Sequence, residues 1–244
     1  MKRVYADLHL CANTKDPSHV SHLVGKASTL GYNLVSMPLP PNVSDGEIGQ
    51  VQRICEEFGV HFASRMDLKP RSPEGLLRDL RRLRRRFEII AVMCESKAVA
   101  RQAAKDRRVD LLNFPQPDFR RCFFDMAEAE LASTCLCYLE IDAKPLLALE
   151  GAARIRLLSI LRREVETAKA FHVPVVVSSG VSEVLLMRKP TELAALTSLF
   201  SLDQASAVDA VSENPMMIVK RNREKLSRHF VAPGIRVVRR GRDC

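Results

Sequence analysis

The stretch Tyr5-Ala6-Asp7-Leu8-His9-Leu10-Cys11-Ala12 decides how the rest of the chain is interpreted. It predicts the end of a first β-strand, along which Asp7, His9 and Cys11 occupy every second position. Because side chains alternate across a strand, these three point to the same side. Two histidines at positions 9 and 11 could reach one metal ion, but cysteine stands at the second position. If other ligand positions are also altered, the chain is a barrel of enzyme ancestry that has stopped binding metals.

The length and the net charge of the chain limit the classes of protein to which it can belong. A chain of 244 residues, 46% of them hydrophobic, is long enough for one α/β barrel, since such barrels commonly have about 250 residues. Lys and Arg number 38 against 29 Asp and Glu, a formal net charge of +9. This excess favours a polyanionic partner, with nucleic acid as the first candidate and an anionic membrane surface as the second.

The cysteines and the apolar segments indicate the cellular compartment in which the protein is expected. There are seven cysteines, an odd number without a CxxC pair, which favours free thiols over a disulfide framework or a zinc knuckle. No signal peptide and no long uninterrupted apolar segment is visible. We therefore expect a soluble, cytoplasmic protein that does not bind a membrane.

Short β-rich runs alternate with amphipathic stretches, a pattern typical of a parallel sheet with crossover helices. The expected strands are 4–10, 33–37, 61–66, 88–93, 111–114, 136–141, 173–177 and 184–187. The expected helices are 19–30, 45–58, 73–86, 97–105, 119–131, 145–171, 190–200, 203–212 and 215–228. The pattern predicts a TIM-like (β/α) barrel, with eight or fewer closed strands. An open doubly wound sheet is the alternative, although no GxGxxG motif or P-loop supports it.

The whole chain, 1–244, is expected to form one barrel domain. Its last segment, 227–244, is short and basic and contains Gly and Pro. We expect that segment to form an edge strand or a partly flexible tail.

In a barrel, functional side chains collect where the strands end. The polar residues at these ends are Asp7, His9, Cys11, Ser36, Arg65, Asp67, Glu95, Asn113, Glu140, Asp142, Lys144, Ser178, Ser179, Arg188 and Lys189. A phosphoesterase with two or three metal ions needs many His, Asp and Glu there, and this set contains one histidine. Glu140 and Asp142 could form an acid/base pair, but salt bridges to neighbouring Arg and Lys are favoured. Cys11 has no histidine placed to activate it as a nucleophile.

The densest basic stretch is Arg78-Asp79-Leu80-Arg81-Arg82-Leu83-Arg84-Arg85-Arg86. Helical spacing places Leu76, Leu80, Leu83 and Phe87 on one stripe and arginines on most of the remaining surface. Such a run is either a solvated helix face or a phosphate-binding face, because arginine pairs with phosphate in bidentate fashion. The basic residues are not interleaved with aromatic ones, so we expect recognition of backbone or shape without base stacking.

Taken together, these motifs resemble a known family, the thirty-kilodalton protein subunit of ribonuclease P, which is component 3 in archaea. The resemblance extends over nearly the whole chain. It rests on 5–9, on Arg65 at the end of the third strand, and on the blocks 111–114, 139–141, 175–180, 186–190, 193–196 and 210–215. The first strand also resembles that of metal-dependent PHP phosphoesterases. In those enzymes a carboxylate tends to occupy the position of Arg65, and an Asp-x-His lies near the position of 178–180.

The family resemblance implies an RNA-binding, TIM-like barrel of the PHP-related type, with extra C-terminal helices and no catalytic residue of its own. The catalyst would be the RNA, which removes the 5′ leader of precursor tRNA and requires Mg²⁺, while this chain binds no cofactor. The implied partners are ribonuclease P RNA, a small α/β-sandwich subunit in a heterotetramer, further ribonuclease P proteins and, indirectly, precursor tRNA.

We expect the RNA contacts to be basic side chains on the rim or on helix faces. The candidates are Arg65, Arg81, Arg85, Arg101, Arg107, Arg120, Lys144, Arg188 and Lys189. The first alternative is a PHP-type phosphoesterase that acts alone through Asp7, His9, Glu140 and Asp142, with Asp7 and His9 as the residual metal candidates. The second is a metabolic barrel enzyme in which Arg65 and Arg188 hold a substrate phosphate.

Overall fold

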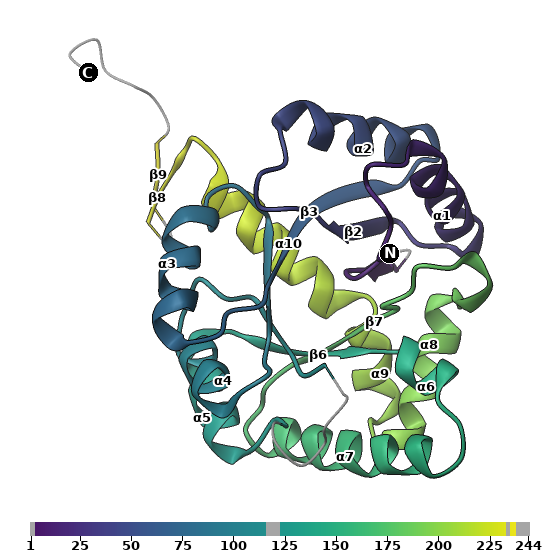
Figure 1. Cartoon of the computed structure of the whole chain (residues 1–244), viewed down its shortest axis with the longest axis vertical. Coiled ribbons are helices and arrows are strands. Elements are labelled where there is room, and N and C mark those ends of the chain that lie inside the picture. Colours follow the sequence, from purple (N-terminus) through teal and green to yellow (C-terminus); the bar gives the residue numbers. More distant parts are fainter. Residues whose placement is uncertain (1–2, 116–122, 233–234, 238–244) are drawn as a thin grey trace.

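The computed structural model describes residues 3–115, 123–232 and 235–237. Within these residues, seven strands form one sheet in which each strand pairs in parallel with the next along the chain (Figure 1). They are β1 (Ala6–Asp7), β2 (Leu34–Pro38), β3 (His61–Leu68), β4 (Ile89–Met93), β5 (Leu111–Asn113), β6 (Tyr138–Asp142) and β7 (Val175–Ser178). This sequential order is that of a barrel, so the barrel prediction is confirmed and the doubly wound alternative is wrong.

The two ends of the sheet meet through the segments that follow β1 and β7. The Gly180 amide donates a hydrogen bond to the His9 carbonyl at 2.9 Å, and the Cys11 amide donates to the Val181 carbonyl at 2.9 Å. Gly180 has a φ of +64°, and a Cβ there would lie 2.9 Å from the side chain of Asp142. Glycine is therefore required where the chain closes the barrel beside β6.

The expected eighth strand, 184–187, is wrong: Val184–Leu186 forms a short 3₁₀ helix, η1. Its apolar composition resembles that of a strand. However, Leu185 is 86% exposed, and the sheet offers this segment no neighbouring strand with which to pair.

Helices alternate with the strands and cover the outside of the barrel (Figure 1). They are α1 (Pro17–Leu30), α2 (Asp45–Glu57), α3 (Pro73–Leu83), α4 (Lys97–Ala104), α5 (Met126–Cys135), α6 (Lys144–Ala148), α7 (Gly151–Ala170), α8 (Pro190–Leu196), η2 (Thr197–Phe200), α9 (Gln204–Ala210) and α10 (Glu213–Leu226). Their starts follow local signals. Ser44 caps α2 in a capping box with Glu47, and Ser72 caps α3, whose first residue is Pro73.

Two expected helices have different boundaries. The helix expected at 119–131 begins at Met126, because the Asp125 side chain caps it, and residues 116–122 lie outside the described part. The helix expected at 145–171 is two helices, α6 and α7. They are separated by extended backbone at Leu149 and Glu150 and a positive φ at Gly151.

Buried side chains form two layers. The larger cluster lies between the sheet and the surrounding helices. The smaller one fills the inside of the barrel with residues such as Leu8, Leu34 and Ile89. Ile218 and Val219 of α10 belong to this inner cluster, so α10 supplies part of the barrel's interior.

Helix α10 closes the amino-terminal end of the barrel, crossing it in Figure 1. The Asn214 amide donates to the carbonyl of Val175 at the start of β7, and the Asn222 amide donates to Glu88, immediately before β4. Arg223 donates to the carbonyl of Phe62 near the start of β3. The opposite, carboxyl-terminal end of the barrel therefore remains as its mouth.

The described part of the C-terminal segment forms a separate antiparallel pair, β8 (Phe230–Ala232) and β9 (Ile235–Arg236). It is not an edge strand of the main sheet, because both strands pair only with each other. Residues 238–244 lie outside the described part. Within the described residues, no helix is long and apolar enough to span a membrane.

Candidate functional site

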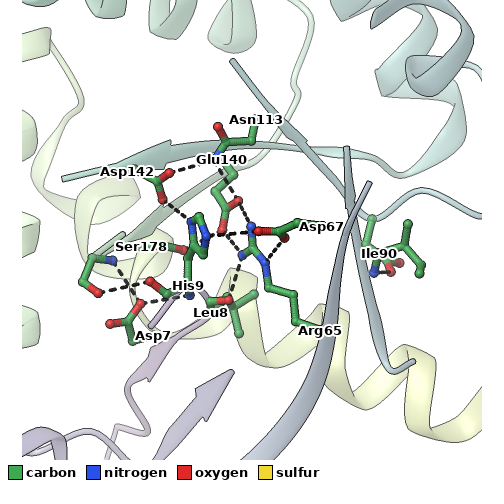
Figure 2. A network of polar contacts seen from close by, with 12 residues as sticks. Asp7, Leu8, His9, Arg65, Asp67, Ile90, Asn113, Glu140, Asp142 and Ser178 are labelled. Atoms are coloured by element: carbon green, nitrogen blue, oxygen red, sulfur yellow. Dashed lines mark hydrogen bonds and ion pairs between the residues drawn. The ribbon is translucent and has the colours of Figure 1, made fainter. Parts of the chain in front are cut away.

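Arg65 lies at the centre of the mouth and points into the barrel from β3 (Figure 2). Its side chain is fully buried. Both terminal nitrogens bind Glu140 of β6, with Nη1–Oε1 at 2.6 Å and Nη2–Oε2 at 2.7 Å. Nε donates to Asp67 Oδ1 at 2.6 Å, and Nη1 also donates to the carbonyl of Leu8 at 2.7 Å. A guanidinium with this many charged partners is the strongest type of buried ion pair.

The charges of these partners fix the ionisation of Arg65 and Asp67. Burial by itself would lower the pKa of Arg65, but the negative charges of Asp67 and Glu140 outweigh it and raise that pKa. Burial would likewise raise the pKa of Asp67, and the charges of Arg65 and His9 lower it well below its ordinary value. The pair therefore stays charged over the whole range in which the protein folds.

His9 lies between two carboxylates. Its Nδ1 is 2.8 Å from Asp142 Oδ1 and its Nε2 is 3.2 Å from Asp67 Oδ2. Burial and the charge of Arg65 lower the pKa of His9, but Asp142 and Asp67 raise it well above its ordinary value overall. Both ring nitrogens face carboxylate oxygens, the arrangement of an imidazolium that donates from both nitrogens, and in that state His9 has no lone pair to offer a metal ion.

The remaining polar groups complete this network. Ser178 Oγ donates to Glu140 at 2.8 Å, and Asn113 Nδ2 lies 3.1 Å from Glu140 and 3.0 Å from Asp142. Asp7 belongs to the seam between the sheet ends, where its Oδ1 accepts from the amides of Ser179 and His9. Burial raises the pKa of Asp7, and its Oδ2 has no partner.

These contacts decide whether the mouth can hold a metal ion. Donor atoms of His9, Glu140 and Asp142 lie within 4.8 Å of one another, the spacing of a metal-binding group. Glu140 is already bound by both terminal nitrogens of Arg65, and both ring nitrogens of His9 face carboxylate oxygens of Asp67 and Asp142. The residues present therefore do not fit a metal ion, because the guanidinium of Arg65 occupies the place of the cation. The salt bridge to an arginine favoured for Glu140 is present, with Arg65 as its partner, whereas Asp142 pairs with His9 and not with an Arg or Lys.

This burial corrects the predicted role of Arg65. Direct RNA contact by Arg65 is wrong, because no atom of its side chain is exposed and every donor group is used inside the barrel. A substrate phosphate held by Arg65 is wrong for the same reason. The sequence identified Arg65 as a residue at a strand end but gave no sign that Glu140 and Asp67 neutralise it.

The other candidate cations are divided between the two ends of the barrel. Arg81, Arg85 and Arg107 are exposed near the ends of α3 and α4, at the amino-terminal end. Exposed Arg101 of α4 lies 3.5 Å from buried Glu128. Residues 144, 188 and 189 lie on the mouth side, after β6 and β7, and only Lys189 of these is exposed. Arg120 falls outside the described residues.

Several arginines of the basic stretch have structural roles that sequence reasoning missed. Arg86 donates to the carbonyls of Pro41 and Val43 at 2.8 and 2.6 Å. Arg84 donates to the Phe87 carbonyl at 3.1 Å and lies 3.4 Å from Asp110. The α3 helix ends at Leu83, so only the arginines before that point follow the helical stripe.

Glu164 of α7 provides a pH-dependent element next to the mouth. It is buried and accepts a hydrogen bond from the Phe124 amide at 2.9 Å. Burial raises its pKa from 4.5 to about 7. The folded protein therefore binds a proton here that the unfolded chain releases. We expect this group's contribution to stability to fall by about 3 kcal/mol as the pH rises from 4.5 to 7 and then to remain constant.

The Glu164→Gln variant keeps the hydrogen-bond acceptor and removes the titration. Urea unfolding at pH 5 and pH 8 should show that the variant gains stability relative to the wild type at the higher pH. A difference in unfolding free energy that is the same at both pH values would contradict this account.

The fold and the mouth define a class of protein: a seven-stranded (β/α) barrel whose mouth holds a buried arginine paired with carboxylates. Comparison with known proteins agrees with this class. The family model described as RNase P subunit p30 matches residues 4–227, so the chain belongs to the RNase P subunit p30 family. The resemblance inferred from the sequence is thereby confirmed.

Similar proteins and structures extend over the same length. Ribonuclease P protein component 3 of Methanosarcina mazei is 31% identical over 219 residues, which is 90% of this chain and 89% of that protein. The protein of the same name from Halobacterium salinarum is 32% identical and covers 96% of both chains. A chain in the cryo-EM structure of archaeal ribonuclease P with mature tRNA has a TM-score of 0.83 at 22% identity, over 96% of this chain and 98% of that one.

The barrel itself is also found among hydrolases. A putative prolidase from Bifidobacterium longum has a TM-score of 0.57 at 10% identity and covers 91% of this chain and 70% of that one. This likeness shows a shared fold only.

Proposed function

We propose that the chain is a noncatalytic, RNA-binding protein subunit of ribonuclease P. It supports the RNA-catalysed endonucleolytic removal of 5′ leaders from precursor tRNA, the reaction classified as EC 3.1.26.5. The observation that carries this proposal is the buried Arg65–Glu140 pair in a chain of the RNase P subunit p30 family. A mouth in which an arginine fills the cation position has no free ligand set for hydrolysis, so the chemistry belongs to the RNA.

The subunit acts through electrostatics and positioning. A folded RNA brings phosphates close together around its metal ions, and their repulsion opposes the active fold. Arginine and lysine side chains that dock on the backbone offset this repulsion and lower the Mg²⁺ concentration that the RNA needs, an effect that weakens as the salt concentration rises. The Mg²⁺ is bound by the RNA, and this chain binds no cofactor.

Candidate contacts are the basic residues that the sequence identified, without the buried Arg65; Arg120 among them lies outside the described residues. They are Arg81, Arg85, Arg101, Arg107, Arg120, Lys144, Arg188 and Lys189. The proposed partners are ribonuclease P RNA, a small α/β-sandwich subunit in a heterotetramer, further ribonuclease P proteins and, indirectly, precursor tRNA. The chain works in the cytoplasm as one barrel domain with a basic C-terminal segment.

The alternative is a phosphoesterase that acts alone through Asp7, His9, Glu140 and Asp142. It requires His9 and Glu140 to release their partners and bind metal. The protonated state of His9 and the chelation of Glu140 by Arg65 disfavour this alternative.

Purified chain and ribonuclease P RNA from the same organism provide the test. We expect the chain to form a salt-sensitive complex with the RNA in gel-shift titrations, and to cleave no precursor tRNA alone in Mg²⁺, Mn²⁺ or Zn²⁺. Failure to bind this RNA would overturn the proposal. Metal-dependent cleavage by the chain alone, abolished by the chelator EDTA, would instead establish the phosphoesterase.

A further inference from the structure

The amino-terminal end of the barrel carries a concentration of positive charge. Arg81, Arg85, Arg107 and Lys225 are exposed there, and we call these four residues the amino-terminal face. Arg81 lies in the last turn of α3 and Lys225 in the last turn of α10, while Arg107 follows α4 and precedes β5. Three elements far apart in sequence thus present their cations at one end of the molecule.

Anchored arginines hold this face together. Arg84 lies 3.4 Å from Asp110 Oδ2, and Arg221 of α10 lies 2.8 Å from Asp110 Oδ1. Arg221 also donates to the carbonyl of Leu136 at 2.9 Å and stacks on the ring of Tyr138. Asp110 additionally accepts from the Ile90 amide at 2.9 Å. A single buried carboxylate therefore fixes α3, α10 and the strand starts in one rigid arrangement.

The cations of this face repel one another. Partial burial, and then the positive charges of Arg221, Arg84 and Arg107, lower the pKa of Lys225, while Asp110 acts in the opposite direction. The side chains of Arg81, Arg85, Arg107 and Lys225 have no hydrogen-bond or ion-pair partner among the described residues. A cation near a helix C-terminus interacts favourably with the helix dipole. This interaction explains one basic residue at the end of each helix, but it does not explain why the basic residues of several elements lie close together.

Nearby acids do not relieve this repulsion because they are already paired. Asp79 lies 3.7 Å from Arg82, and Glu88 lies 2.6 Å from Arg223. The Asp110 carboxylate is shared by two arginines. A polyanion from outside the chain is therefore the natural counter-charge for this face.

The centre of the mouth differs from this face, although the mouth side also carries the exposed cations Lys69, Arg71, Arg156 and Lys189. Three carboxylates, Asp67, Glu140 and Asp142, surround its two buried cations. Lys144 Nζ lies 3.4 Å from Ser182 Oγ, and the Arg188 guanidinium donates to the carbonyls of Leu185 and Met187. Lys144 and Arg188 are thus bound to neutral oxygens beside the mouth, whereas Arg81, Arg85, Arg107 and Lys225 have no such partner among the described residues.

We infer that the amino-terminal face, on the side of the barrel opposite the mouth, is the surface that binds the phosphate backbone of RNA. This inference rests on the RNA-binding function proposed above and assigns that function to one end of the barrel. Arginine forks match phosphate oxygens in bidentate fashion, which favours RNA backbone as the partner. The ring of Tyr138 at this end lies against the Arg221 guanidinium, so that ring is not free to stack on a base.

A pair of charge-matched variants of the full chain tests the inference. The face variant combines Arg81→Gln, Arg85→Gln and Arg107→Gln. The control variant combines Lys69→Gln, Arg71→Gln and Arg156→Gln, three exposed cations on the mouth side, after β3 and in the first half of α7. Both variants lose three positive charges, so a difference between them reports location and not net charge.

The measurement is the dissociation constant for ribonuclease P RNA of the same organism across a KCl titration, with thermal unfolding to verify folding. We expect the face variant to bind at least about tenfold more weakly and to lose about two to three from the slope of log affinity against log salt. We expect the control variant to remain within about twofold of the wild type. Equal losses in both variants, or a larger loss in the control, would overturn the assignment.

Failure of the proposed function gives a different result. In that case the wild-type chain itself shows no salt-dependent binding of the RNA, whichever residues are changed, and the inference falls with it. Lys225→Gln provides a further variant if the triple change lowers the melting temperature, because Lys225 is exposed and has no hydrogen-bond or ion-pair partner among the described residues. Unchanged affinity and salt slope in Lys225→Gln would then count against the face.

Discussion

Replacing Arg65 with methionine should lower the free energy of unfolding by about 3–5 kcal/mol. Methionine fills a similar volume but leaves Glu140 and Asp67 buried without their cation. A buried carboxylate without a partner must either remain charged in a poor medium or take up a proton, and both options cost stability. Urea unfolding followed by circular dichroism measures the change.

Two further variants control this experiment. Arg81→Met removes an exposed arginine and should change stability by no more than about 0.5 kcal/mol. Arg65→Lys keeps the charge but loses the two-pronged contact with Glu140, so its loss should lie between those of the other two variants. A loss in Arg65→Met as small as that in Arg81→Met would show that the network does not hold the barrel together.

Replacing Ile218 with alanine should cost about 2–5 kcal/mol. Ile218 is fully buried and projects from α10 into the inner cluster of the barrel. Truncation leaves a cavity that the surrounding strands cannot close, because they are fixed by their hydrogen-bonded neighbours. The neighbouring Met217 is 50% exposed on the same helix, so Met217→Ala should cost less than about 1 kcal/mol.

Thermal or urea unfolding of the two alanine variants separates packing from helix propensity, because both changes are made in α10. Similar losses in both variants would mean that α10 lies loosely on the barrel. It would also weaken the argument that α10 carries Arg221 and Lys225 at fixed positions.

The parts of the fold that local signals determine could be predicted from sequence. Ser44 and Ser72 cap their helices as expected, and the apolar runs that form β4 and β7 are recognisable by composition. The sequence also predicted the last helix, expected at 215–228 and observed at Glu213–Leu226. It could not show that Ile218 and Val219 of this helix fill the inside of the barrel, because that depends on where the strands come together.

The mouth was harder to predict because its energetics depend on distant partners. Arg65 meets Glu140 from 75 residues away in the chain, and no local pattern reveals that pairing. A strand-end arginine therefore resembled an RNA contact, although it is the internal counter-ion of the barrel. The strand predicted at 184–187 was wrong for a related reason. A strand requires a neighbouring strand, and the composition of a segment does not show whether one is present.

Precursor-tRNA cleavage by the cognate ribonuclease P RNA across a Mg²⁺ titration tests the central claim most directly. The reaction is run with and without this chain and its small partner subunit. Our account predicts that the proteins shift activity to lower Mg²⁺ and that the proteins alone cleave nothing. The absence of a shift, together with metal-dependent phosphoesterase activity of the isolated chain, would contradict it.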